Sequence, residues 1–238
     1  HATYHSQYDA PLTADIEGFA EPVSGWIGVS QGPEDLANTG MAALSESLRY
    51  PGQIATFIAP ADHAWSPAHA CEATLAPPEP PRADDAQLAA AVAALTSEGE
   101  RVLFLGGRAL REDALLQAGR IAAATGARLI TETFCARHQR GAGRVSVERL
   151  PYFGEQAAEA LQNTAQMVVV GSKPPVSFFA YPGKPSWLTP EGANLVELAD
   201  PTVDALDALT RLADALDAPQ APAQLQPPAQ HTLAAGPI

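Results

Sequence analysis

Short apolar runs alternate with amphipathic, helix-like segments through most of this chain. Three such runs, at residues 101–105, 127–131 and 167–170, are each long enough for one strand. Glycine follows the first and the third directly, at Gly106 and Gly171. Apolar runs that stop at glycine and alternate with helical patterns are typical of a parallel, doubly wound sheet. The pattern therefore predicts an α/β fold built on a mostly parallel, Rossmann-like sheet.

Helical periodicity fills the intervals between these runs. Asp84 or Asp85 is placed to cap a helix that continues to about Ser97. Apolar residues recur at helical spacing over 112–125, and Gly126 supplies a C-terminal stop. Two further helices are predicted at 155–161 and 203–216, a fourth strand at 194–198, and loops at 137–144 and 172–192.

The chain before residue 76 shows the same pattern on a smaller scale. Residues 32–35, Gly-Pro-Glu-Asp, indicate a helix start, because proline and carboxylates suit the free N–H groups of a first turn. The pattern predicts a short helix at 15–20, a strand at 22–27, a helix from that start to about Arg49, and a strand at 53–58.

Two Pro-rich segments divide the chain. Residues 76–82 contain four prolines, which make an extended and fairly stiff linker. Ala, Pro and Gln supply 15 of the 21 residues from 218 to 238, a composition typical of a tether. We expect part of a first α/β domain at 1–75, a linker at 76–83, a larger domain at 84–217 and a second linker at 218–238. Because the chain starts at His1 without Met and finishes in a tether, it is expected to be a piece of a longer protein.

Composition and charge narrow the range of functions. The 238 residues carry a net charge of −13, which argues against nucleic acid and anionic membrane surfaces as partners. No apolar run is long enough for a transmembrane helix, and the N-terminus has no signal-peptide pattern. Cys71 and Cys135 lie in no metal-binding or redox spacing, and we interpret both as reduced thiols of a cytoplasmic protein.

The ends of the predicted strands carry the candidate binding residues. Gly106 and Gly107 follow one strand, and Gly171, Ser172 and Lys173 follow another. Ligands bind at the carboxyl ends of the strands in such sheets, where glycine lets a phosphate approach the backbone and lysine can neutralise it. These five residues are the predicted cofactor-binding set. A tight turn that needs positive φ, followed by an exposed lysine, also explains them.

Other clusters give less specific signals. The spacing of His63, His69 and Cys71 matches no common metal-ligand set, so no metal ligand is assigned. The polar segment at 4–9 contains His and Gln, which are common in active sites, but a structural loop explains it as well. No catalytic residue is assigned, because the sequence contains no nucleophile motif, P-loop or paired-carboxylate pattern.

A basic patch interrupts this acidic chain. Arg137, His138 and Arg140 lie close together in the predicted Gly/Arg loop. Such a patch is suited to an anion, but a solvated loop explains the same residues.

Several pieces of the chain, taken in order, resemble a known family. Residues 5–13, 17–18, 22–24, 52–55 and 60–62 resemble the second half of the pyrimidine-binding domain of thiamine-diphosphate enzymes, where a strand that starts at glycine ends in Pro-x-Asp. Residues 84–216 resemble the central domain of the same family. The paired glycines, the glycine after 167–170, and the segment Val176-Ser-Phe-Phe-Ala-Tyr-Pro-Gly-Lys-Pro185 are most similar to acetolactate-synthase-like members.

The resemblance implies a chemistry for the intact protein. Its cofactors would be thiamine diphosphate and Mg²⁺, its substrate a 2-keto acid, and its reaction decarboxylation or carboligation. The family's activating glutamate would precede His1, and its Gly-Asp-Gly magnesium motif would follow Ile238, so this segment alone is expected to be inactive. The active sites of such enzymes lie between subunits, which implies a homodimer or homotetramer.

The same resemblance allows a second interpretation. Some members bind FAD or ADP at the strand ends of the central domain, which correspond here to the five predicted cofactor-binding residues. Arg108 stands where a third glycine is common in the FAD pattern. The alternative to an enzyme fragment is therefore a non-catalytic module that binds FAD or ADP, or one that only supports an oligomer.

Overall fold

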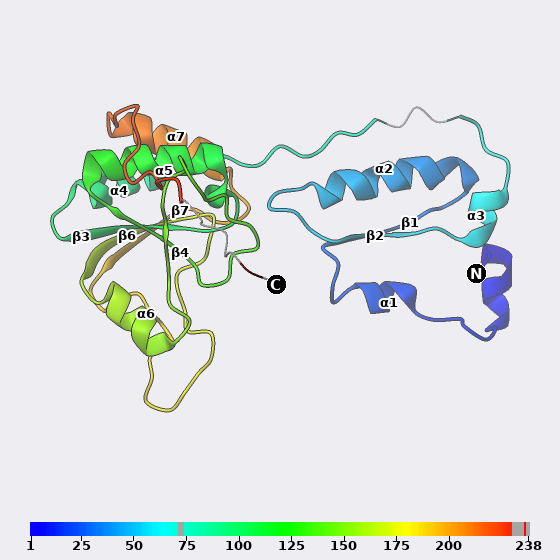
Figure 1. Cartoon of the computed structure of the whole chain (residues 1–238). Helices are drawn as coiled ribbons and strands as arrows, with labels where there is room; N and C mark the ends of the chain where they lie inside the picture. Colours follow the sequence, from blue (N-terminus) through cyan, green and yellow to red (C-terminus); the bar gives the residue numbers. More distant parts are fainter. Residues whose placement is uncertain (71–73, 230–235, 237–238) are drawn as a thin grey trace. The chain divides into compact units, whose positions relative to one another are not determined.

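A computed structural model describes residues 1–70, 74–229 and 236 of the chain (Figure 1). The chain divides between Pro80 and Pro81 into two compact units, called here unit 1 (residues 1–80) and unit 2 (residues 81–238). Each unit has its own parallel sheet with helices packed against it. The predicted α/β fold with parallel sheets is confirmed.

Unit 1 is a βαβ arrangement with short helices at its edges. Its elements are η1 (Thr3–Tyr8), α1 (Ile16–Ala20), β1 (Trp26–Val29), η2 (Pro33–Asp35), α2 (Leu36–Ser47), β2 (Ala55–Ile58) and α3 (Ala61–Trp65). β1 and β2 are parallel, with Trp26 opposite Ala55 and Val29 opposite Ile58. α2 connects these strands and packs on both of them.

Unit 1 buries little apolar surface. Every residue of β1 and β2 is only half-buried. Among the described residues, the buried apolar side chains of this unit are those of Ala2, Ala20 and Ala43, whereas Leu12 and Phe19 are exposed. A two-stranded sheet normally needs further strands or another layer before it is stable.

Unit 2 contains a five-stranded parallel sheet. Its elements are α4 (Asp85–Thr96), β3 (Glu100–Leu105), η3 (Gly107–Leu110), α5 (Glu112–Thr125), β4 (Arg128–Thr131), β5 (Glu148–Arg149), α6 (Gly154–Leu161), β6 (Thr164–Val170), β7 (Asn194–Ala199) and α7 (Ala205–Ala215). The strand order is β5-β4-β3-β6-β7, and all neighbours are parallel. The chain builds one side of the sheet from β3 and then crosses to the other side, so the topological switch point lies between β3 and β6.

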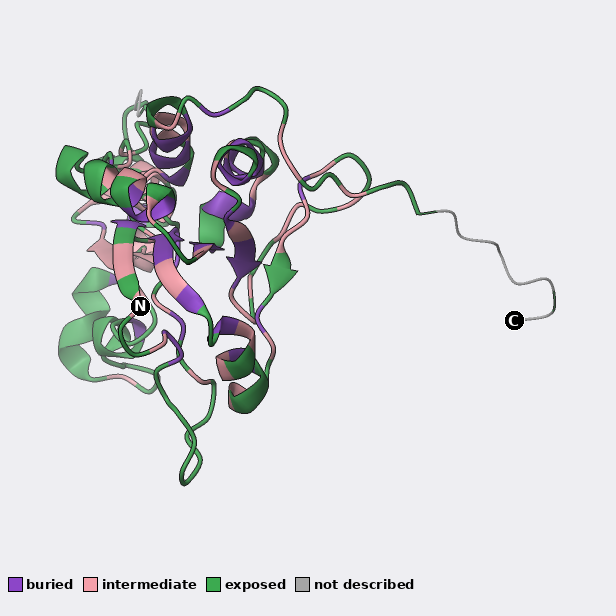
Figure 2. Cartoon of the chain, turned by 90° about the vertical axis from the view of Figure 1, so that its left-hand side faces the viewer, coloured by how far each residue is buried: buried purple, intermediate pink, exposed green. Residues whose placement is uncertain are grey.

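Helices cover both faces of this sheet (Figure 1). On one face, Leu103 and Leu105 of β3 join a core formed with α4, α5 and α7, which includes Leu115. On the other face, Phe104 packs in a second core with Leu161 of α6. Successive residues of β3 thus enter opposite cores, as the strand geometry requires. Figure 2 shows buried residues concentrated in the strands and on the sheet-facing sides of the helices.

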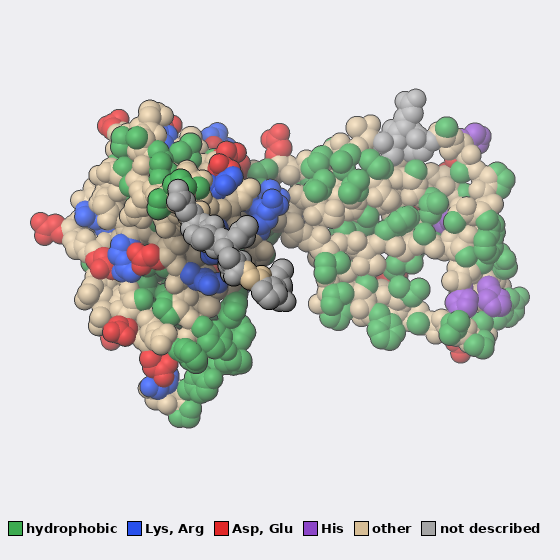
Figure 3. All heavy atoms as spheres, in the orientation of Figure 1, with side chains coloured by type: hydrophobic (Ala, Val, Ile, Leu, Met, Phe, Trp, Pro, Cys, Tyr) green, Lys and Arg blue, Asp and Glu red, His purple; other side chains and the backbone are tan. Residues whose placement is uncertain are grey.

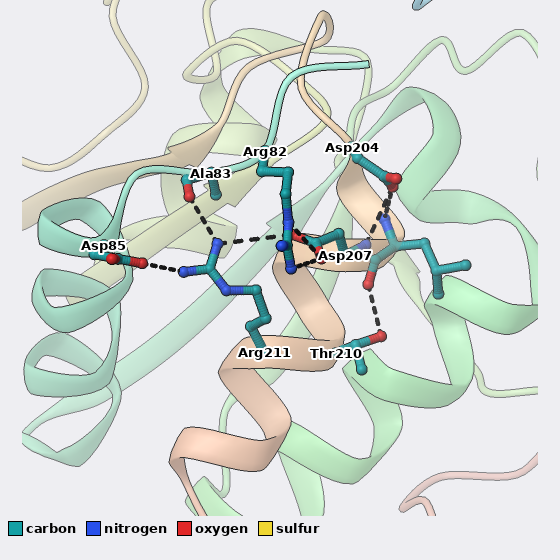
Figure 4. Close-up of polar contacts among 8 residues, drawn as sticks. Arg82, Ala83, Asp85, Asp204, Asp207, Thr210 and Arg211 are labelled. Carbon is teal, nitrogen blue, oxygen red and sulfur yellow. Dashed lines mark hydrogen bonds and ion pairs between the residues drawn. The ribbon is translucent and has the colours of Figure 1, made fainter. Parts of the chain in front are cut away.

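Polar contacts join the segment before α4 to α7 (Figure 4). Asp204 caps α7, since its side chain accepts hydrogen bonds from two backbone N–H groups of the first turn. Arg82 forms an ion pair with Asp207 at 2.5 Å, and Arg211 donates to the Ala83 carbonyl at 2.7 Å. These contacts hold the start of unit 2 against its last helix.

The structure differs from the predicted elements in several places. The strand predicted at 22–27 is wrong in its bounds, because residues 21–23 form a turn and β1 begins only at Trp26, and the short helix α3 was not predicted. The two-residue strand β5 adds a fifth strand to the roughly four that were predicted, and its length is too short for a periodic signal. The segment predicted as a tether begins with contacts to unit 2, where Leu225 forms an antiparallel bridge with Val145. The Ala223 N–H also donates to the Gly119 carbonyl at 2.9 Å.

The helices of the described residues are of ordinary length for a globular protein. The longest is α5, with 14 residues. Within residues 1–70 and 74–229, no helix combines the length and the apolar character that crossing a bilayer would require.

Candidate functional site

The carboxyl ends of neighbouring strands bring the predicted binding residues together. β3 and β6 are adjacent and parallel, so the residues that follow them lie at one edge of the sheet. Gly106 and Gly107 follow β3, while Gly171, Ser172 and Lys173 follow β6. This edge is the switch point of the sheet, where open α/β folds bind their ligands.

The two glycine turns at this edge pack directly on each other. The Gly106 N–H donates to the Val170 carbonyl at 3.0 Å, which extends the sheet into the turn. Gly107 and Gly171 have positive φ angles of 49° and 68°. A Cβ on Gly171 would lie 2.5 Å from the Gly106 oxygen, and one on Gly107 would lie 2.8 Å from the Gly171 oxygen. Glycine is therefore needed here because two backbones approach each other closely.

Ser172 and Lys173 have different surroundings. The Ser172 side chain is buried, and its Oγ donates to the Lys173 carbonyl at 3.1 Å. Lys173 itself is exposed. The edge therefore presents one solvated ammonium group beside a shielded hydroxyl.

The structure adds a carboxyl group that the sequence analysis did not single out. Glu132 directly follows β4, the other neighbour of β3, and is half-buried. Burial raises the pKa of Glu132, and hydrogen bonds from the Gly107 N–H and the Ser172 hydroxyl oppose that increase. The Gly107 N–H and the Ser172 hydroxyl, which could bind a phosphate, thus lie beside the carboxyl group of Glu132. The available sequence signal was an acidic residue directly after the apolar run at 127–131.

His63 and His69 of unit 1 have separate partners. His63 is buried, and its Nδ1 lies 3.0 Å from the Ser30 Oγ. The Nδ1 of His69 lies 3.0 Å from Glu34 in an exposed pair. Cys71 lies outside the described residues. Among the residues that are described, no three His, Cys, Asp or Glu side chains are grouped to hold a metal ion.

The polar segment at residues 4–9 lies at the surface of unit 1. It forms most of η1, and all of its residues are exposed. Asp62, just after β2, accepts hydrogen bonds from the Thr3 N–H at 2.8 Å and the Thr3 hydroxyl at 2.5 Å. These bonds lower the pKa of Asp62. They hold the polar segment, with His5, close to the carboxyl end of β2.

Six aromatic side chains form an exposed cluster in unit 2. The ring centroids of Phe134 and Phe178 lie 5.0 Å apart, and those of Phe178 and Phe179 lie 4.7 Å apart. Hydrophobic side chains gather at the end of unit 2 that carries α6 and the loop after β6 (Figure 3). The segment at 176–185, which carries part of the family resemblance, supplies half of the cluster. Its members are Phe134, Tyr152, Phe153, Phe178, Phe179 and Tyr181.

The predicted basic patch lines a cavity of about 220 Å³, called here the basic cavity. Burial and the positive charges of Arg140 and Arg149 lower the pKa of His138. The sequence analysis did not include Arg149, because pairing of β5 with β4 is what brings it to this place. Cys135, whose thiol is free among the described residues, also contributes to the wall. The lining residues are Cys135, Ala136, Arg137, His138, Arg140, Val147, Arg149 and Gln226.

One curated protein resembles this chain over most of its length. The chain is 44% identical over 215 residues to the "Putative acetolactate synthase large subunit IlvX" of Mycobacterium tuberculosis. The match covers 90% of this chain and 41% of that protein, so the chain spans less than half the length of this relative. No protein-family model matches the chain.

Solved structures of thiamine-diphosphate-dependent enzymes share the fold. A "putative thiamin diphosphate-dependent enzyme" from Mycobacterium smegmatis has a TM-score of 0.75 at 22% identity, over 97% of this chain and 47% of its own. The 4-hydroxybenzoylformate decarboxylase of Rhodococcus jostii RHA1 has a TM-score of 0.71 at 18% identity, over 100% of this chain and 48% of its own. The benzoylformate decarboxylase of Polynucleobacter necessarius has a TM-score of 0.73 at 18% identity, over 98% of this chain and 46% of its own.

Proposed function

Starting from the confirmed resemblance to acetolactate-synthase-like, thiamine-diphosphate-dependent enzymes, we propose that this chain is a segment of such an enzyme. Residues 1–75 would be the second half of its pyrimidine-binding domain, and residues 84–217 its central domain. The observation that carries the proposal is the 44% identity over 215 residues to a relative of which only 41% is covered.

The thin core of unit 1 supports its assignment to half a domain. Phe19 is 79% exposed and Ile54 is 59% exposed, although side chains of this kind normally help to form a core. Both clusters of buried apolar residues belong to unit 2. A further layer of strands or helices from the rest of the domain would cover the apolar side chains of unit 1.

The diphosphate and metal end of the cofactor is proposed to bind to residues outside this chain. The sequence contains no Gly-Asp-Gly motif, and among the described residues no three His, Cys, Asp or Glu side chains are grouped to hold a metal ion. These residues do not fit that end of the cofactor, so no step is assigned to them. In the intact enzyme, thiamine diphosphate would supply the electron sink for decarboxylation.

For the intact enzyme we propose decarboxylation or carboligation of a 2-keto acid. The name of the relative, an acetolactate synthase large subunit, supports this substrate class. Because family members form their sites between subunits, the enzyme is proposed to be a cytoplasmic homodimer or homotetramer.

A nucleotide site in unit 2 is a separate proposal. FAD or ADP bound at the switch point would contact the five predicted residues, with Lys173 as the cation. A phosphate there would have to displace the Glu132 carboxyl from its place beside Gly107 and Ser172. Calorimetry with FAD and ADP tests this site. Binding heat that disappears in the Lys173→Ala variant would support the nucleotide site. The absence of binding heat with both nucleotides would rule the site out.

The enzyme proposal is tested by comparing two proteins in one assay. One is the 238-residue chain, and the other is the unprocessed product of its natural gene. Release of CO₂ from a panel of 2-keto acids is measured with thiamine diphosphate and Mg²⁺. We expect activity from the natural gene product and none from the chain. Activity from the chain alone would show that the assignment of the catalytic parts to other segments is wrong.

A further inference from the structure

The basic cavity of unit 2 has a chemistry that the proposed enzyme function does not use. Its walls come from the loop after β4, from β5, and from the segment around Gln226. The Gly141 N–H donates to the Gln226 Oε1 at 2.7 Å, and the Gln226 N–H donates to the Arg144 carbonyl at 2.8 Å. Hydrogen bonds to the backbone therefore hold segments that are far apart in the sequence around one cavity.

The arginines of the cavity lack carboxylate partners in a protein with a net charge of −13. Elsewhere in unit 2, Arg128 and Arg211 form ion pairs with carboxylates. Within the described part of the chain, no ion pair joins Arg137, Arg140 or Arg149 to a carboxylate. All three side chains are exposed, and they line one small space without an internal counter-charge.

The alternation of β5 turns one neighbouring carboxylate away from the cavity. Glu148 and Arg149 are consecutive residues of this strand, so their side chains point to opposite sides. Glu148 forms an ion pair with Arg128 at 2.8 Å. Arg149 lines the cavity. Glu148 is therefore engaged elsewhere, and the positive charge of Arg149 is left to a ligand or to solvent.

His138 lines the same cavity beside the arginines. Its Nε2 is shielded from solvent and has no hydrogen-bond partner among the described residues. Because solvent does not reach this nitrogen, the arginines, and not the His138 Nε2, would contact an anion in the cavity.

We propose that the basic cavity binds a phosphate group, either as inorganic phosphate or as the terminal group of a small ester. A phosphate ester carries about −1.5 to −2 charges at pH 7 and three strong acceptor oxygens, which suits three arginines better than a single carboxylate does. The volume of about 220 Å³ is below the range of about 300–1,000 Å³ that is typical of sites for drug-sized ligands. It therefore suits one small anion or the charged end of a larger one. The proposal does not depend on the thiamine-diphosphate function.

Calorimetry on the 238-residue chain tests the site with inorganic phosphate and with glycerol 3-phosphate. We expect one ligand per chain, and Arg140→Ala should weaken binding by about tenfold or more, because charge-assisted hydrogen bonds to phosphate are strong. Lys184→Ala is the matched control, since it removes one positive charge from an exposed ion pair outside the cavity. That variant should stay within about twofold of the parent. Tighter binding of the ester identifies an organic phosphate, and tighter binding of inorganic phosphate identifies the free ion.

The imidazole NMR signals of His138, assigned by their loss in His138→Gln, provide a second readout. Bound phosphate should raise the pKa of His138, because a nearby negative charge favours the imidazolium. The groups that line the cavity with it are Arg137, Arg140, Arg149 and the Cys135 thiol. Acetate that binds as tightly as phosphate, equal losses in Arg140→Ala and Lys184→Ala, or a His138 pKa that does not respond would each overturn the proposal.

Discussion

Single residues determine what the sheet edge of unit 2 can hold. Gly106 and Gly171 allow two turns to meet backbone to backbone, which fills space at the switch point with the chain itself. Glu132 adds a half-buried carboxyl beside them. A ligand at this edge therefore meets a closely packed backbone, one carboxyl group and the exposed Lys173.

The close approach of the turns predicts a difference between two glycines with similar φ. Gly171 (φ 68°) would place a Cβ 2.5 Å from the Gly106 oxygen, whereas Gly183 (φ 71°) has nothing within 4 Å. Both alanine variants suffer the cost of positive φ, but only Gly171→Ala also forces two backbones apart. We expect Gly171→Ala to lose about 1–3 kcal/mol more free energy of unfolding in urea than Gly183→Ala. Equal losses would show that the turns are not closely packed.

The raised pKa of Glu132 predicts a dependence of stability on pH. The folded state binds the Glu132 proton more tightly than the unfolded state does. The contribution of Glu132 to the free energy of unfolding therefore falls as the pH rises from the ordinary pKa of a carboxyl group through the raised pKa of Glu132. Glu132→Gln stays neutral, so its free energy of unfolding relative to the parent should increase across that window. Urea unfolding at several pH values measures the difference, and Glu159→Gln, at an exposed position on α6, controls for the lost charge. A difference that is constant with pH would contradict the prediction.

At the scale of elements, the sequence predicted those segments whose signals are local. The helix predicted at 112–125 has the bounds of α5, because its apolar periodicity ends at Gly126, which adopts the left-handed conformation. β5 escaped prediction because it is two residues long and exists through pairing with β4. The difference between local signals and distant pairing also explains which site residues could be predicted from the sequence. Gly106 and Gly171 end recognisable strands, whereas the place of Arg149 depends on pairing between distant segments.

The two sheets should differ strongly in stability. β3 and β6 lie at the centre of a five-stranded sheet and are largely buried, whereas β1 and β2 are half-buried in a two-stranded one. Hydrogen exchange on the 238-residue chain should therefore show much faster exchange for β1 and β2 than for β3 and β6. In the natural gene product, the protection of β1 and β2 should increase as the rest of the domain covers them. Equal protection of both sheets in the isolated chain would contradict the half-domain assignment.

At the scale of the whole molecule, the chain combines a unit that has two cores with a unit that has no large buried apolar side chain among its described residues. We interpret unit 2 as a complete central domain and unit 1 as half of a cofactor-binding domain. This interpretation rests on an ordered series of short motifs in the sequence, since no single motif specifies it, and it stays a prediction. The substrate could not be predicted in the same way, because its pocket would be built with residues outside this chain.

Calorimetric titration of thiamine diphosphate with Mg²⁺ into the unprocessed product of the natural gene tests this interpretation most directly. We predict saturable binding by a protein larger than 24.8 kDa, and no binding by the 238-residue chain under the same conditions. A natural gene product that binds no thiamine diphosphate would contradict the assignment of this chain to a thiamine-diphosphate-dependent enzyme.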